Sequence, residues 1–195
     1  MSRRHAAAVL AVAATGLAAG CGSGSGKSSS AANPNAPEVS PSGDIPDNQA
    51  YVPFRLPAGH VTIKVPEGWA RSASGGAVTF TDKLNSIRLE TARASRPLTA
   101  ATATHVEIPK LARSARGFAS PKVGAVHRRA GTALRITYLA SSKPDAVTGK
   151  VTTDAVERYV FFRSGRRAIL TLSGPKAADN VDPWKLVSDS LRFTP

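Results

Sequence analysis

The sequence TDAVERYVFFRSGRRAILTL, residues 153–172, carries the strongest structural signal in the chain. Two β-prone runs, Thr153–Arg163 and Arg167–Leu172, are joined through Ser164-Gly165, a pattern that predicts a β-hairpin. Apolar side chains occupy both faces of the first run, with Tyr159 and Phe161 on one and Val160 and Phe162 on the other. Because a strand that is apolar on both faces must be covered on both, the hairpin is expected inside a sheet that lies between helices.

Further strands are expected on the N-terminal side of this hairpin. Val61, Ile63 and Val65 alternate with polar residues, as in a half-buried strand. The same period or a β-prone composition marks four more segments: Ala77–Thr81, Ser86–Ala92, Val123–Arg128 and Ala133–Ala140. Residues 141–151 carry turn-forming residues and are expected to form a loop.

Two segments change to the period of a helix. Leu98–Arg116 is rich in alanine, and Pro109 within it predicts two short helices or one bent helix, with Pro109 opening the second half. The other helix is expected to begin at Asp182-Pro183-Trp184, with Asp182 as its N-cap and Pro183 at its first position. Its core-facing residues would be Trp184, Val187 and Leu191, and a short terminal strand would follow to Phe193.

The predicted fold class is α+β, with an antiparallel β-sheet of about six to eight strands flanked by two or three helices. The order of these elements resembles the PsbP-like fold. It comprises a strand that ends in a Pro-x-Gly-Trp turn (Val65–Trp69), a mid-chain helix, a long hairpin and an Asp-Pro-Trp helix that leads to Ser190–Phe193. That group includes the extrinsic photosystem II subunit, Ran-binding relatives and actinobacterial lipoproteins of the LpqN type. The resemblance covers about residues 54–193 and implies a sheet between helices and an accessory or binding role, without shared catalytic residues.

The first twenty residues have the pattern of an export signal. Arg3 and Arg4 precede an uncharged run, Ala6–Ala19, which has the length of a signal-peptide core and is too short to span a membrane. The run ends in Leu17-Ala18-Ala19-Gly20-Cys21, which resembles a bacterial lipobox, and Cys21 is the only cysteine in the chain. We therefore expect diacylglycerol on Cys21 and an anchor on the outer face of the cell membrane; general secretion and twin-arginine export both stay open.

A tether is expected between the lipidation site and the domain. Residues 22–49 consist mainly of Gly, Ser, Ala, Pro and Asn, and their only large aliphatic residues are Val39 and Ile45. Such a segment buries too little apolar surface to offset its ordering entropy, so it predicts a flexible linker with a reach of about 30 Å. The chain thus divides into a signal peptide (1–20), a tether (21–50) and a folded domain (51–195).

The sequence offers little for catalysis or for a metal site. His105 and Glu107 would share a face on a strand, but two residues apart on the expected helix they point in different directions. No nucleophile motif distinguishes one serine from the others. A single cysteine excludes an internal disulfide and the usual structural zinc sites. We therefore expect no catalytic residues, no metal and no cofactor.

Positive charge is the most informative feature left, and it belongs to the domain. Residues 51–195 contain 23 Lys and Arg residues against ten Asp and Glu residues, a net charge of +13. Two clusters stand out as candidate anion-binding residues: Arg163, Arg166 and Arg167 beside the hairpin turn, and Arg128 and Arg129 further upstream. Nucleic acid is not expected as the partner, because no stacking aromatic residues are interleaved with the arginines and export removes the chain from it.

The sequence therefore favours a non-enzymatic binding or accessory module at the cell envelope. Its expected partners are the membrane, through Cys21, and either envelope polyanions or a membrane protein. Solvated charge that only keeps the domain soluble is the alternative explanation of the basic surface. An envelope hydrolase with an unidentified Ser/His site, and a small-molecule carrier with an apolar pocket between sheet and helix, also remain open.

Overall fold

A computed structural model describes residues 41–56, 59–145 and 147–195. The expected signal peptide, Cys21 and the tether as far as residue 40 lie outside the described residues. No helix in the described part is both long and apolar enough to cross a membrane.

The predicted hairpin lies within a seven-stranded antiparallel sheet of order β3-β4-β5-β9-β8-β7-β6. Its strands are β3 (Ala70–Ser74), β4 (Ala77–Asp82), β5 (Asn85–Arg93), β6 (Ala119–Arg128), β7 (Gly131–Ser141), β8 (Thr153–Arg163) and β9 (Arg166–Pro175). Ser164 and Gly165 both have positive φ, 47° and 75°, as a type I′ turn requires. The hairpin prediction is confirmed, and β8 and β9 both have a neighbour on each side.

A second sheet was not expected. β1 (Tyr51–Leu56), β2 (Val61–Pro66) and β10 (Arg192–Phe193) form a separate three-stranded sheet of order β1-β2-β10. Val61, Ile63 and Val65 are buried, as their alternation predicts. β2 is the central strand of this sheet and pairs antiparallel with β1 on one side and with β10 on the other.

The first helical region confirms the prediction made from Pro109. It consists of α1 (Ala100–Thr102), the π-helical η2 (Ala103–Glu107) and α2 (Ile108–Ser114), and Pro109 lies in the first turn of α2. Helical backbone precedes Pro109 directly, so the missing proline N–H interrupts the hydrogen-bond ladder between η2 and α2. The change to π-helical geometry directly before Pro109 is the break that the sequence predicts.

The last helix, α3 (Val181–Ser190), begins before the predicted start. Its N-cap position is Asn180, so the prediction of Asp182 as the N-cap is wrong, and Asp182 instead lies exposed in the first turn. Trp184, Val187 and Leu191 are buried, as predicted. The Asn180 side chain makes no cap hydrogen bond, because it contacts residues far away in the sequence.

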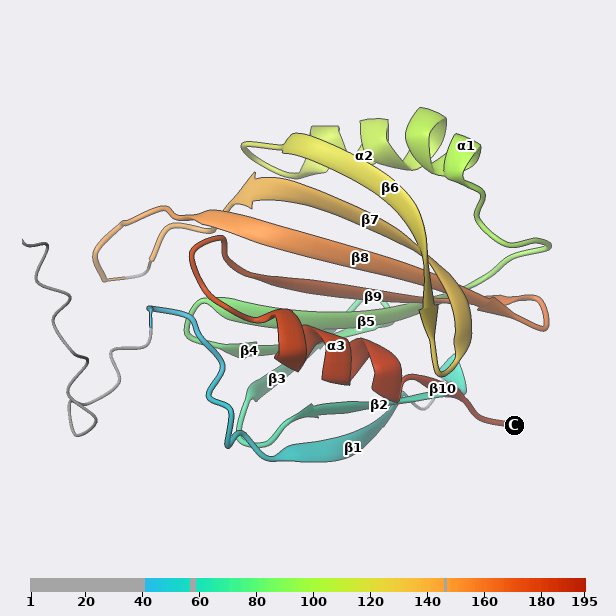
Figure 1. The fold of residues 1–195 in the computed structure, drawn as a ribbon, viewed down its shortest axis with the longest axis horizontal. Coiled ribbons are helices and arrows are strands. Elements are labelled where there is room, and N and C mark those ends of the chain that lie inside the picture. The colour runs from blue at the N-terminus through green and yellow to red at the C-terminus, as the bar shows by residue number, and fades with distance from the viewer. Residues whose placement is uncertain (1–40, 57–58, 146) are drawn as a thin grey trace, which may run out of the picture. The chain divides into compact units, whose positions relative to one another are not determined.

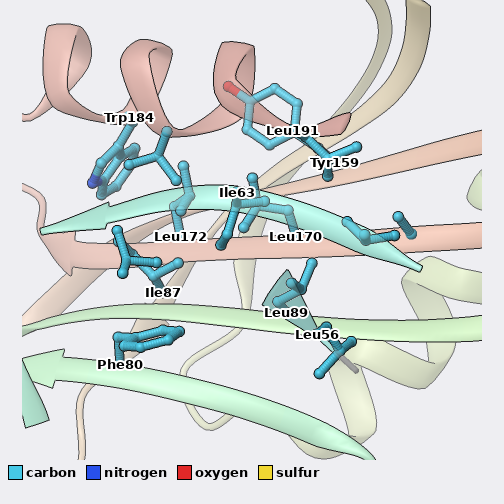
Figure 2. Packing of buried hydrophobic residues seen from close by; sticks show 14 of the residues in the cluster. Leu56, Ile63, Phe80, Ile87, Leu89, Tyr159, Leu170, Leu172, Trp184 and Leu191 are labelled. Carbon is cyan, nitrogen blue, oxygen red and sulfur yellow. The ribbon is translucent and has the colours of Figure 1, made fainter. Parts of the chain in front are cut away.

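The elements form three layers (Figure 1): α1–α2 on one face of the seven-stranded sheet, and α3 with the three-stranded sheet on the other. The larger core lies on the α3 face and includes Phe80, Leu89, Tyr159, Leu170 and Leu191 (Figure 2). The smaller core lies beneath α1–α2, around Ile136 and Val160. The α+β class, with an antiparallel sheet between helices, is confirmed.

The domain begins earlier in the chain than the composition suggests. Ile45 is 5% exposed and belongs to the larger core, and its N–H donates to Asn180 Oδ1 at 2.9 Å. Asp44 Oδ1 accepts a hydrogen bond from the Asp179 N–H at 2.9 Å. The prediction of a flexible tether is therefore wrong for residues 41–49, because one buried aliphatic residue and a few paired polar groups hold this segment to the domain.

Candidate anion-binding site

The end of the sheet at the β8–β9 turn brings three arginines together. Arg163 on β8 is opposite Arg166 on β9, and Arg166 is opposite Arg93 on β5. Residues that are directly opposite share a face of the sheet, so the three form a cross-strand row, called here the arginine row. The row lies on the α3 face, because Phe161 and Ala168, two residues before Arg163 and two after Arg166, are core residues on that face.

A pocket of about 410 Å³ lies beside the arginine row. Arg163, Ser164 and Arg166 form one side, and His60 with Phe193–Pro195 forms the other. His60 Nδ1 is 2.8 Å from the backbone oxygen of Pro195, and the Thr194 N–H donates to the His60 carbonyl at 2.8 Å. Residues 194 and 195 are thus held against His60, which fixes the wall opposite the arginines.

Arg167 lies at the same end of the sheet but on its other face. It is opposite Phe162 on β8 and Ala92 on β5, and its Nη2 donates to the Arg96 carbonyl at 3.1 Å. The predicted cluster of Arg163, Arg166 and Arg167 is therefore divided between two faces. Arg93 and Arg96, which are distant from the hairpin in the sequence, complete a set of five arginines at this end of the sheet.

The electrostatics of this end favour an anion. In the described part of the chain, no carboxylate forms an ion pair with Arg93, Arg96, Arg163 or Arg167. Arg167 Nε and Thr194 Oγ1 are buried and have no hydrogen-bond partner among the described residues. Buried polar groups in native proteins are nearly always satisfied, by protein groups or by ordered water. Guanidinium groups match the oxygens of phosphate or carboxylate in two-pronged hydrogen bonds.

The second predicted cluster is placed differently. Arg128 is held inside the domain, with 11% of its side chain exposed. Its Nε donates to Ser188 Oγ at 2.8 Å, its Nη2 donates to the Tyr159 hydroxyl at 3.2 Å, and its guanidinium lies over the Tyr159 ring. Arg129 is exposed and lines a separate groove beside α3 with Lys64 and Arg192. Neither residue lines the pocket beside the arginine row.

The histidines do not form a catalytic arrangement with the described residues. His127 Nδ1 is 3.1 Å from Thr132 Oγ1, and none of the described histidines has a hydrogen bond to a serine or to an Asp or Glu side chain. His105 is exposed in η2, and Glu107 instead pairs with Lys110 at 3.5 Å. Within the described ranges, no group of three His, Cys, Asp or Glu side chains is placed to hold a metal. The contact that would favour the hydrolase is therefore not found in this part of the chain.

Comparison with known proteins identifies the fold. No family model matches the chain, and no curated protein sequence matches it. The solution structure of cyanobacterial PsbP (CyanoP) from Synechocystis sp. PCC 6803 is similar at 17% identity, with a TM-score of 0.51, over 78% of this chain and 99% of that protein. The chain therefore has the PsbP-like fold that the order of its sequence features predicts.

Two looser structural similarities accompany this one. The Ran-binding protein Mog1p of Saccharomyces cerevisiae is 10% identical, with a TM-score of 0.47, over 74% of this chain and 96% of that protein. LpqN of Mycobacterium tuberculosis, described as involved in cell envelope biogenesis, is 18% identical, with a TM-score of 0.42, over 76% of this chain and 93% of that protein. At such identities a likeness concerns the fold alone, and a fold of this kind hosts unrelated functions.

Proposed function

We propose that this chain is a lipid-anchored extracytoplasmic protein whose PsbP-like domain acts as a non-enzymatic binding module for anionic components of the cell envelope. The anchor is diacylglycerol on Cys21, at the end of the export signal. The binding surface is the arginine row, and the phosphate groups of wall polymers or lipid headgroups are its ligands. The observation that carries the proposal is the register of Arg93, Arg163 and Arg166, which puts these three residues directly opposite one another on one face of the sheet.

The surroundings of the arginine row favour a role in anion binding over the alternative that its charge only keeps the domain soluble. Charge that serves only solubility is normally dispersed and mixed in sign, whereas here five arginines gather at one end of the sheet. Thr194, whose Oγ1 is buried without a hydrogen-bond partner among the described residues, lines the pocket beside the row. Each basic group close to an anionic surface contributes about 1 kcal/mol, so the row would contribute about 3 kcal/mol at low salt.

Vesicle binding tests this proposal. The domain should bind vesicles containing about 30% anionic lipid, and the triple substitution Arg93→Gln, Arg163→Gln and Arg166→Gln should weaken the partition on the order of 100-fold at low salt. The wild-type binding should fall steeply as the ionic strength rises to about 0.15 M, where the Debye length is about 8 Å. A wall polymer rich in phosphodiesters replaces the vesicles in a second arm and separates the two sources of phosphate.

A matched control removes the same charge elsewhere. Arg113, Arg116 and Lys122 are exposed on α2, in the loop after it and on β6, and none of them forms an ion pair in the described part of the chain. Their replacement by Gln lowers the net charge equally and should weaken binding only a few-fold. If both triple variants bind alike, net charge and not the arginine row determines binding, and the proposed site is refuted.

A further inference from the structure

A second pocket, of about 310 Å³, lies between α3 and the strands β7 and β8. Its charged side chains are Arg128, Arg135, Glu157, Lys176 and Lys185, and Trp184 of α3 forms part of its wall. The volume is at the lower end of the range for small-molecule sites. The carrier alternative expects an apolar pocket between sheet and helix, whereas this one has five charged side chains among its lining residues.

The polar groups in this pocket form a connected network around Tyr159. The Tyr159 ring is buried, and its hydroxyl oxygen points towards α3 (Figure 2). The hydroxyl donates to Glu157 Oε2 and accepts from Arg128 Nη2 at 3.2 Å. Arg135, directly opposite Tyr159 in the register, donates to Glu157 Oε1 at 3.3 Å. Both oxygens of the one carboxylate in the pocket are therefore already engaged.

The charge that remains is positive. Arg128 lies 3.7 Å from Asp189, and Lys185 Nζ donates to Asp189 at 2.8 Å, so Asp189 neutralises only one of these two cations. Glu157 similarly compensates Arg135. Four cations against two carboxylates leave a net charge of +2, and Lys176 forms no ion pair in the described part of the chain.

The polar network around Tyr159 is not required to pack α3 against the sheet. Desolvating a guanidinium and a carboxylate is costly, and apolar residues of similar size would often hold α3 to the sheet at least as well. Arg128 has five N–H donors, and three of its hydrogen bonds are to protein groups, so donors are left over. Arg135 is 41% exposed at the side chain and makes one hydrogen bond, to Glu157, so it too has donors left for a ligand.

From this geometry we infer that the pocket beneath α3 binds a small organic anion, a carboxylate or a phosphate ester with a compact carbon skeleton. Arg135 and Lys176 bind the anionic group, Arg128 holds the Tyr159 hydroxyl in place, and Trp184 packs against the carbon skeleton. The site is distinct from the arginine row: Arg93, Arg163 and Arg166 do not line it. Binding of a small anion in this pocket can therefore be tested separately from binding of polyanions to the arginine row.

Trp184 provides a direct readout of binding. The chain has two tryptophans, so the Trp69→Phe variant leaves Trp184 as the only indole. Titration of this variant with glycerol 3-phosphate and, separately, with succinate should give a saturable change in fluorescence with at least one of them below about 10 mM. Glycerol, which has no charge, should give none.

Two substitutions assign the response to the pocket. Arg135→Gln and Lys176→Gln should each raise the apparent Kd roughly tenfold, because each removes a charged donor at the ligand. The Arg113→Gln and Arg116→Gln variants remove exposed charge away from both pockets and should bind the probe with unchanged affinity. Urea unfolding of each variant checks that the fold is intact. The inference is overturned if neither probe gives a saturable signal, or if Arg135→Gln and Lys176→Gln bind as tightly as the parent.

Discussion

Asn180 joins three segments that are far apart in the sequence. Its Oδ1 accepts from the Ile45 N–H at 2.9 Å, and its Nδ2 donates to the Gly43 carbonyl at 3.0 Å and to Asn85 Oδ1 at 3.1 Å. The residue is 3% exposed, so these groups have little access to water. The Asn180 amide therefore fastens residues 43–45 and β5 to the start of α3.

Replacing Asn180 by Ala should lower the free energy of unfolding by about 2–4 kcal/mol. The substitution leaves a buried N–H and a buried side-chain oxygen without partners, and each unsatisfied group costs about 1–3 kcal/mol. Urea unfolding measures the loss. Asp182→Ala is the matched control, because Asp182 is exposed in the first turn and contributes under about 1 kcal/mol through the helix dipole. Equal losses in the two variants would contradict this assignment.

Asp154 has a buried carboxyl group, and burial disfavours its ionised form. It is 8% exposed on β8, and Thr152 Oγ1 donates to it at 3.3 Å. Burial raises the pKa of Asp154 above its ordinary value, and the hydrogen bond from Thr152 opposes this only in part. The folded state therefore holds the proton more tightly than the unfolded state does, so this residue makes the domain less stable as the pH rises through the raised pKa.

Asp154→Asn should therefore be more stable than the wild type at pH 7, and the difference should shrink as the pH falls towards about 4, the ordinary pKa of an aspartate. Urea unfolding at several pH values measures it. Asp145→Asn should not share this gain, because N–H groups of Thr148 and Val147 and the Thr148 hydroxyl donate to Asp145 and lower its pKa. A wild type more stable than Asp154→Asn at neutral pH would reverse the assigned sign.

Structural features that depend on a few residues close together in the sequence could be predicted from the sequence. The Ser164-Gly165 turn, the break at Pro109 and the alternation in β2 each depend on a few neighbouring residues, and each is found in the structure. The N-cap of α3 could not be predicted in this way. Asp-Pro is a common helix start, but contacts of Asn180 with Gly43, Ile45 and Asn85 determine where this helix begins.

The candidate site could be predicted only in part, because some of its residues are brought together by strand pairing between distant parts of the chain. Arg163 and Arg166 could be selected because the hairpin turn brings them together, whereas adding Arg93 requires the pairing of β5 with β9, which are separated by more than seventy residues. Arg166 and Arg167 are consecutive on a strand, so the two-residue period alone places them on opposite faces. Arg128 could not be recognised as buried, because Ser188 and Tyr159 bind it from distant elements.

The seven-stranded sheet has the N-terminal segment of the domain at one end and the arginine row at the other. Residues 41–43 lie beside Asn85 and Pro175, at the end of the sheet where β8 begins and β9 finishes. The arginine row lies where β8 finishes, ten residues further along the strand. At roughly 3.3 Å per residue the two ends are about 33 Å apart, which is several times the Debye length of about 8 Å at physiological salt. If the chain is anchored through Cys21 as proposed, this separation exceeds the electrostatic reach of a membrane that lies at the end of the sheet near residues 41–43.

We accordingly expect the full chain to bridge two surfaces. The lipidated protein, reconstituted in uncharged vesicles, should capture anionic vesicles in a second population, and raised salt should release them. Vesicle aggregation followed by light scattering, with lipid-mixing dyes to exclude fusion, measures the bridging. Cys21→Ser should bind anionic vesicles without bridging, because it has no anchor. The Arg93→Gln, Arg163→Gln and Arg166→Gln triple variant should stay anchored and also fail to bridge, so bridging by that variant would place the second contact elsewhere on the domain.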